Sequence, residues 1–348
     1  MESIKTCSFP RAGFLGNPSD GYFGKTLSFA FSEYRVELTL TESAKMRFVP
    51  GEVDDAMFDS PENLVRDIRL YGYYGGIRML KAVAKLFFEY CFDRGIQLPR
   101  RNFTAEYRTN IPRLVGLSGS SAICSAMLKA LMKFYGVEIP LEYTPTICLE
   151  AEKLELGINC GFQDRVIQMY NGLVFMDFEK SFVEANNYGR YERLDPALLP
   201  NIYVAFDPNR AEESGKAHKK VKRLFEEKKP DIVSAMGEFA DIAQQGRNAL
   251  LAGEKGKIPA LVNANFDLRD RIFNVAELNR NMVMTARTSG ASAKFAGSGG
   301  AIVGTYEDEE QFSRLSAALA TIGCTTFKPT IAVTDEIAPA VDGSWRNS

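Results

Sequence analysis

A short stretch of small residues between a strand pattern and a helix pattern is the part of this sequence best suited to chemistry. Residues 112–122 read PRLVGLSGSSA. Apolar and polar residues alternate over 102–111, which predicts a strand. Residues 122–135 lack Pro and Gly and end at Gly136, which predicts a helix. The first N–H groups of a helix lack internal partners and carry partial positive charge, so this stretch indicates a nucleotide phosphate site.

Two common phosphate-binding sequences are excluded. The chain contains no Walker sequence, in which Gly, four residues and Gly-Lys-Ser/Thr follow one another. The nearest approach to G-x-G-x-x-G is Gly297-Ser298-Gly299, which has Ile302 in place of the third glycine. Taken by itself, a Gly/Ser loop before a helix is also typical of a tight connection without a ligand.

Composition limits the class of protein. Of the 348 residues 45% are apolar and 25% are charged, with a formal net charge of −2, which is typical of a soluble globular enzyme and disfavours a nucleic-acid binder. The basic run 219–223 is followed by acidic residues and is interpreted as the solvent-facing side of a helix. No apolar run could span a membrane, and the first residues lack a signal-peptide core.

Cysteine and histidine usage narrows the chemistry. The six cysteines form no C-x-x-C pair, so we expect neither a zinc site nor a disulfide framework, and we expect a reducing, cytoplasmic location. Cys124 and Cys148 lie in apolar helical contexts and are expected to be buried. The single histidine, His218, makes a His-based triad or metal site improbable, so acid–base chemistry falls to carboxylates or lysines.

Periodicity predicts a mixed α/β chain in two domains. We expect the first domain to cover 1–199, the second 200–333 and a poorly ordered tail 334–348. Strands are expected within 3–50, 102–111, 171–178, 201–207 and 294–305, and helices over 61–95, 122–135, 143–156, 212–228, 231–251 and 267–288.

Three segments occur in an order that resembles a known family. They are 8–20 (SFPRAGFLGNPSD), the loop 112–122, and 294–301 (KFAGSGGA). Over nearly the whole chain this order and spacing is similar to the GHMP kinases. The resemblance implies an α+β fold in which an N-terminal domain with a left-handed β-α-β unit faces a C-terminal ferredoxin-like domain, with the active site in the cleft between them. It also implies ATP and Mg²⁺ as cofactors and a small sugar as the substrate.

A fourth stretch, 151–164, resembles the sugar-kinase segment that carries a magnesium-binding glutamate and a catalytic aspartate. The resemblance implies that Glu152 and Ser120 bind the metal, that Asp164 accepts the proton of the sugar hydroxyl, and that Arg11 neutralises charge near the phosphate. Gly119 stands where the family usually has Ser or Thr, so which loop serine meets the metal stays open. The implied ATP-binding residues are Pro112, Gly116, Leu117, Ser118, Gly119, Ser120, Ser121 and Ala122, and the glycine-rich C-terminal motif contributes Gly297, Ser298, Gly299 and Gly300.

The segment 16–24 (GNPSDGYFG) resembles the plant-type glucuronokinases within this family, as do 109–122 and 161–166. This resemblance implies phosphorylation of D-glucuronic acid at its anomeric hydroxyl, with Asp20, Asn17 and Tyr22 binding the sugar. A uronate carboxylate needs a cation or a cluster of N–H donors. The candidates are Arg11, Lys25 and Arg165, and the sequence does not choose among them.

Other functions stay open at this stage. A kinase of the same family could act on galactose, arabinose or a heptose phosphate. A non-catalytic sugar and nucleotide sensor could share the fold, but the presence of both Glu152 and Asp164 argues against it. A third possibility is a two-domain protein whose glycine-rich loops are only turns. The sequence indicates no oligomeric state.

Overall fold

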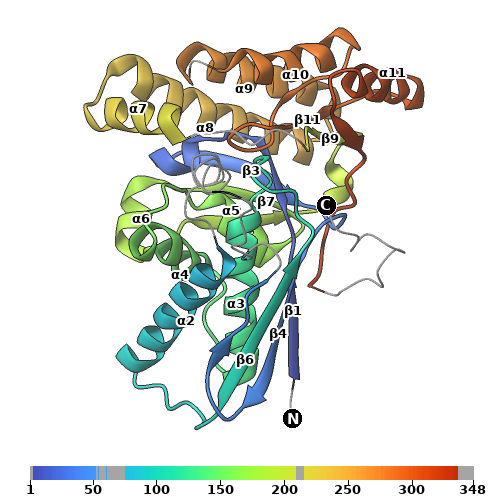
Figure 1. The fold of residues 1–348 in the computed structure, drawn as a ribbon. Coiled ribbons are helices and arrows are strands. Elements are labelled where there is room, and N and C mark those ends of the chain that lie inside the picture. The colour runs from blue at the N-terminus through green and yellow to red at the C-terminus, as the bar shows by residue number, and fades with distance from the viewer. Residues whose placement is uncertain are drawn as a thin grey trace.

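The computed structural model describes residues 3–51, 54, 60, 75–208, 215–273 and 275–335, with only the backbone for 215–219. Within this part of the chain, helices pack around three four-stranded sheets (Figure 1). No helix among the described residues is long and apolar enough to cross a membrane. The cytoplasmic location expected from the sequence stays a prediction.

The first sheet has the order β1-β4-β6-β5, in which only the β5–β6 pair is parallel. Its strands are β1 (Ser3–Ser8), β4 (Val36–Ser43), β5 (Arg47–Phe48) and β6 (Asn102–Thr109). Alternate residues of β6, Phe103, Ala105 and Tyr107, are buried as the sequence predicts. Helix α3 (Gly119–Tyr135) packs on this sheet and α2 (Gly76–Asp93) packs on α3, so α3 is apolar nearly all round.

The second sheet is antiparallel, with the order β2-β3-β7-β8. It contains β2 (Arg11–Leu15), β3 (Lys25–Ala30), β7 (Leu173–Asp177) and β8 (Arg190–Leu194). Helix α5 (Gln163–Tyr170), which also belongs to the first half of the chain, packs on this sheet. Short elements around it are η1 (Ser19–Tyr22), α4 (Thr144–Glu150), the π-helix η3 (Ala151–Glu155), α6 (Lys180–Asn186) and η4 (Pro196–Leu198).

The third sheet lies wholly after residue 200. Its antiparallel strands β9 (Ile202–Phe206), β10 (Lys294–Phe295), β11 (Ala301–Thr305) and β12 (Thr325–Phe327) have the order β10-β11-β9-β12. Helices α7 (Gly215–Glu226), α8 (Pro230–Leu251), η5 (Lys255–Lys257), α9 (Ile258–Phe273) and α10 (Glu277–Thr288) connect β9 to β10, and α11 (Glu309–Ala320) connects β11 to β12. This β-α-β-β-α-β connectivity is ferredoxin-like, which confirms the expected α+β fold.

The two halves of the chain are packed together. Helix α8 contacts β3, and α9 contacts β2, so helices of the second half cover part of the second sheet (Figure 1). A Cβ on Gly246 of α8 would lie only 2.1 Å from Leu15 Cδ1, which shows how closely that helix approaches. The domain limits 1–199 and 200–333 and the left-handed β-α-β unit stay predictions.

Two expectations about helices differ from the structure. The single helix expected over 267–288 is wrong, because α9 ends at Phe273 and α10 starts at Glu277, after Ala276 with extended backbone. The break lets Phe273 pack into the main core while α10 packs into a separate apolar cluster. Helix α3 begins at Gly119 rather than Ala122. The expectations for 61–74 and 336–348 lie outside the described residues.

Candidate active site

A cavity of about 850 Å³ lies where the sequence motifs meet. Its walls come from the loop before α3, from η1, from the segment that joins η3 to α5, and from α7 and α9. The expected site residues that line it are Arg11, Asn17, Asp20, Tyr22, Pro112, Gly116, Leu117, Ser118, Gly119, Ser120, Glu152, Asp164, Gly297 and Ser298. Ser121, Ala122, Gly299, Gly300 and Lys25 do not line it.

The N-terminus of α3 faces this cavity. Among the described residues, no acceptor pairs with the backbone N–H groups of Gly119, Ser120 and Ser121. Two hydrogen bonds fix the Ser118 carbonyl oxygen, one from Gln168 Nε2 at 2.9 Å and one from Ser121 Oγ at 3.1 Å. Three free N–H groups at the start of a 17-residue helix form a ready anion site.

The glycines around this helix start lie in two different environments. Gly116 has φ +79°, and a Cβ there would lie 2.4 Å from the Gly299 carbonyl oxygen. A Cβ on Gly297 would lie 2.2 Å from the Gly116 oxygen, so these glycines let the third motif pack backbone to backbone on the loop. A Cβ on Gly119 would meet only Ile111, at 3.6 Å. Contacts with the described residues therefore do not require a glycine at 119, unlike at 116 and 297.

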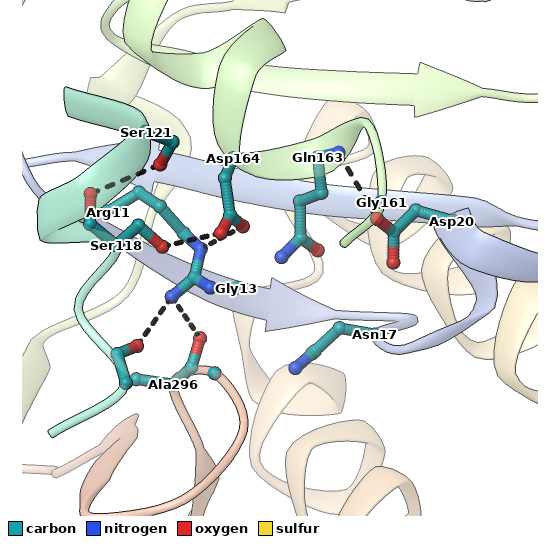
Figure 2. A network of polar contacts seen from close by, with 12 residues as sticks. Arg11, Gly13, Asn17, Asp20, Ser118, Ser121, Gly161, Gln163, Asp164 and Ala296 are labelled. Carbon is teal, nitrogen blue, oxygen red and sulfur yellow. Dashed lines mark hydrogen bonds and ion pairs between the residues drawn. The ribbon is translucent and has the colours of Figure 1, made fainter. Parts of the chain in front are cut away.

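Arg11 joins three segments that are far apart in the sequence (Figure 2). Its Nε donates to Asp164 Oδ1 at 2.6 Å, and its Nη1 donates to the carbonyl oxygens of Gly116 at 2.8 Å and Ala296 at 3.0 Å. Ser118 Oγ donates to the other carboxylate oxygen of Asp164 at 2.7 Å. These contacts bring the carboxylate of Asp164 to the start of α3.

The electrostatics keep Asp164 ionised. Burial alone would raise its pKa, but the charges of Arg11 and Arg165 and the hydrogen bonds from Arg11 and Ser118 outweigh burial and lower the pKa to about 2. Asp164 is therefore a carboxylate at any physiological pH. It can accept a hydrogen bond from a hydroxyl. It is a weak base, so it can take the proton of that hydroxyl only after the hydroxyl has become acidic during the reaction.

Glu152 is fully buried and doubly engaged. Ser120 Oγ donates to its Oε1 at 2.9 Å, and Arg165 donates to its Oε2 through Nε at 2.8 Å and through Nη2. Glu152 lies on the π-helix η3. Such segments are rare in proteins overall, and those that occur are often found at functional sites. The described residues contain no cluster of three or more His, Cys, Asp or Glu side chains suited to a metal. Ser120 and Glu152 instead offer two adjacent oxygen ligands. Mg²⁺ in proteins often binds only one or two side-chain oxygens and takes its other ligands from phosphates and water, so this pair is compatible with Mg²⁺.

Asp20 lies next to the start of α5 and beside Gly161, whose carbonyl oxygen accepts a hydrogen bond from Arg165. The backbone N–H of Gln163 donates to its Oδ2 at 3.2 Å, and a Cβ on Gly161 would lie 2.1 Å from that oxygen. Burial, and next the charge of Asp164, raise the pKa of Asp20 to about 6. The two aspartates of the cavity thus have opposite shifts, which is typical of paired carboxylates with separate roles.

Asn17 is oriented by a lysine that the sequence analysis left without a role. The buried Lys294 donates from Nζ to the carbonyl oxygens of Gly13 at 2.7 Å and Phe295 at 2.8 Å, and also to Asn17 Oδ1. The Asn17 amide nitrogen has no partner in the described part of the chain and borders the cavity. Asn17 is thereby oriented as a donor toward whatever occupies that space.

The proposed uronate cations are otherwise engaged. Lys25 pairs with Gln244 Oε1 at 2.9 Å and with Asp177 at 3.5 Å, away from the cavity. Arg165 is 3% exposed and is committed to Glu152 and to the Gly161 carbonyl. Arg11 is equally committed to Asp164. These three positions therefore do not supply a free cation.

Sequence reasoning assigned no role to Gln168, Lys294 or Gly161, although each positions a site group. Lys294 and Gly161 lie inside the segments that resemble the family, so their place in those segments could have marked them as site residues. Gln168 lies one turn beyond Asp164 on α5, and its helical register was the available signal.

Similar known proteins identify the family to which this chain belongs. Residues 78–172 match the family described as GHMP kinases N terminal domain. Probable glucuronokinase 2 of Arabidopsis thaliana is 46% identical over 303 residues, which cover 85% of this chain and 82% of that protein. The chain belongs to the GHMP kinases. Its similarity to glucuronokinases within this family identifies it as a sugar kinase, a phosphotransferase with an alcohol group as acceptor.

Two further relatives of this GHMP kinase bear on its sequence and its fold. Glucuronokinase 1 of A. thaliana is 43% identical over 307 residues, which cover 86% of this chain and 84% of that protein. The crystal structure of Lactococcus lactis galactokinase in complex with galactose aligns with a TM-score of 0.74 over 96% of this chain and 95% of that chain, at 16% identity. The second comparison establishes a shared fold only.

Proposed function

We propose that this GHMP kinase transfers the γ-phosphoryl group of ATP to the anomeric hydroxyl of D-glucuronic acid and releases ADP and glucuronate 1-phosphate. The observation that carries the proposal is the contact between Ser118 and Asp164, because it brings a carboxylate to the anion site at the start of α3. The choice of sugar rests on the two Arabidopsis glucuronokinases, which are 46% and 43% identical to this chain.

The chain's own residues can divide the work of phosphoryl transfer. The free N–H groups at the start of α3 would bind phosphate oxygens of ATP, and Arg11 would offset the charge that develops between nucleotide and sugar. Ser120 and Glu152 would hold Mg²⁺, which when bound neutralises charge on the β- and γ-phosphates. Asp20 and Asn17 would bind sugar hydroxyls.

Asp164 would orient the attacking hydroxyl and receive its proton late. A pKa of about 2 makes Asp164 too weak to remove the proton from a free sugar hydroxyl. Phosphoryl transfer passes through a loose transition state, in which little bonding to the attacking oxygen is needed. Once the new P–O bond forms, that oxygen becomes positive and its proton passes readily to the carboxylate.

The competing functions are separable by a substrate panel. Release of ADP should be measured through a coupled assay with ATP, Mg²⁺ and, in turn, glucuronate, galacturonate, galactose, arabinose, glucose and mevalonate. We expect glucuronate to give the highest kcat/KM. Faster turnover of galactose or arabinose would assign another sugar within the family, and ATP binding without turnover of any sugar would favour a sensor.

The raised pKa of Asp20 predicts a pH dependence. Above about pH 6 Asp20 is ionised and accepts hydrogen bonds from sugar hydroxyls, and below that pH it is protonated and binds them less well. We therefore expect the KM for the sugar to rise as the pH falls through about 6, while Asp164, with its pKa of about 2, stays ionised and kcat changes little. Initial rates between pH 5 and 8 would measure both constants.

The Asp20→Asn variant is the control for this profile, since it keeps the shape of the side chain and removes the titrating group. Its KM should be high and independent of pH over the same range. If the rise in KM near pH 6 persists in Asp20→Asn, another group is responsible.

A further inference from the structure

The outer part of the cavity brings together residues of both halves of the chain. Asn17, Asp20 and Tyr22 come from β2–η1, whereas Lys222 and Phe225 come from α7. The rings of Tyr22 and Phe225 meet edge to face with their centroids 4.9 Å apart. This contact fixes the face of α7 that borders the sugar-binding residues.

Lys222 lies on that same face of α7. It precedes Phe225 by three positions, and helix residues with this spacing are neighbours on one side. Lys222 is partly exposed and lines the cavity. No hydrogen bond or ion pair joins it to any residue that the structure describes, although Glu226, one turn further along, also lines the cavity. Its ammonium group is therefore available to a ligand.

The other cations that line the cavity are less suited to a sugar carboxylate. Arg11 and Arg165 are held by Asp164 and Glu152. Arg269 is 4% exposed and donates to the carbonyl oxygens of Gly297 at 3.0 Å and Ser298 at 2.9 Å. Two more cations, Arg113 and Lys153, also line the cavity and are the sequence neighbours of Pro112 and Glu152, which the family resemblance assigns to ATP and Mg²⁺.

We propose that Lys222 of α7 binds the C6 carboxylate of the uronate and makes the enzyme prefer a uronic acid to a neutral hexose. This inference rests on the proposed function, because it assumes that the sugar carries a carboxylate. An ammonium group is a compact point charge on a flexible stem, and it can pair with a carboxylate at the open side of a cavity. The C-terminal half of the chain would then set specificity for a reaction whose other groups come mainly from the N-terminal half.

The test compares Lys222→Met and Lys222→Arg with the wild-type protein, with Lys220→Met as a matched control. Lys220 is exposed on the same helix and does not line the cavity. KM and kcat should be measured for glucuronate and for glucose, together with the dissociation constant of glucuronate in the presence of a non-hydrolysable ATP analogue. Circular dichroism would establish that each variant is folded.

We expect Lys222→Met to raise the KM and the dissociation constant of glucuronate by roughly ten- to a hundred-fold, the usual effect of losing a charge-assisted hydrogen bond. The KM of glucose should not change, Lys222→Arg should recover most of the loss, and Lys220→Met should behave as wild type. Unchanged glucuronate constants in Lys222→Met, or equal losses for both sugars, would overturn the role of Lys222. A wild-type protein without activity on glucuronate would instead overturn the proposed function, and with it this inference.

Discussion

Replacing Asp164 with asparagine is expected to lower kcat by about 10²–10⁴-fold, the usual effect of losing a positioned proton acceptor. Asparagine has the same shape but cannot accept the proton of the sugar hydroxyl, and its neutral amide no longer balances the charge of Arg11. The N–H groups at the start of α3 are unchanged, so MgATP should still bind. Steady-state kinetics and calorimetric titration with an ATP analogue would measure the two effects separately.

Asp177→Asn is a matched control for that variant. Asp177 is also ion-paired, to Lys25 at 3.5 Å, and its side chain is 21% exposed, as is that of Asp164. It does not line the cavity. We expect Asp177→Asn to retain near wild-type turnover. Turnover of Asp164→Asn close to that of the wild type would remove Asp164 from the mechanism.

Replacing Arg165 with methionine is expected to lower the free energy of unfolding by about 3–5 kcal/mol, because the carboxylate of Glu152 would stay buried without its partner. The double variant Glu152→Leu/Arg165→Met should recover most of that stability, since apolar side chains often replace a buried ion pair at little cost. It should still lack activity, because the carboxylate proposed to hold Mg²⁺ is gone. Equilibrium unfolding in urea of the wild type, Glu152→Leu, Arg165→Met and the double variant would supply the four free energies of the cycle.

An exposed ion pair elsewhere provides the comparison. Arg247 pairs with Glu192 through two hydrogen bonds of 2.6 and 2.8 Å, but both side chains are partly exposed. Arg247→Met should therefore cost under about 1 kcal/mol. If Arg165→Met costs no more than Arg247→Met, the buried pair does not stabilise the site as we argue. If the double variant retains Mg²⁺-dependent turnover, Glu152 is not a metal ligand.

Local patterns predicted the elements on which the site is built. Alternation of apolar residues predicted β6, and the run of good helix formers up to Gly136 predicted the body of α3. The expected start of α3 was Ala122, the first residue of the stretch without Pro or Gly, whereas the helix begins three residues earlier, at Gly119. The break between α9 and α10 has no proline or glycine to mark it. Phe273 at the end of α9 packs in the main core, whereas α10 packs in a second apolar cluster that also contains Phe266 of α9, and the sequence does not display this arrangement.

The candidate site was only partly predictable, for a similar reason. Motif letters pointed to Arg11, Glu152 and Asp164, whose roles are still to be tested, but spacing could not show that Arg165 is paired with Glu152. The basic run that includes Lys222 was interpreted as a solvent-facing helix surface. Val221 is buried and Lys222 borders the cavity, so one side of α7 faces inward. Which side does so depends on how the helix packs on Tyr22, a contact between distant parts of the chain.

The most direct test of the account is to identify the product made from glucuronate, ATP and Mg²⁺ by phosphorus and proton NMR. We predict a single new phosphomonoester, coupled to the anomeric proton of the sugar, that forms in step with ADP and forms about 10²–10⁴-fold more slowly when Asp164→Asn replaces the wild-type protein. A phosphate attached at another carbon, or consumption of ATP without a sugar phosphate, would contradict phosphoryl transfer to the anomeric hydroxyl at this site.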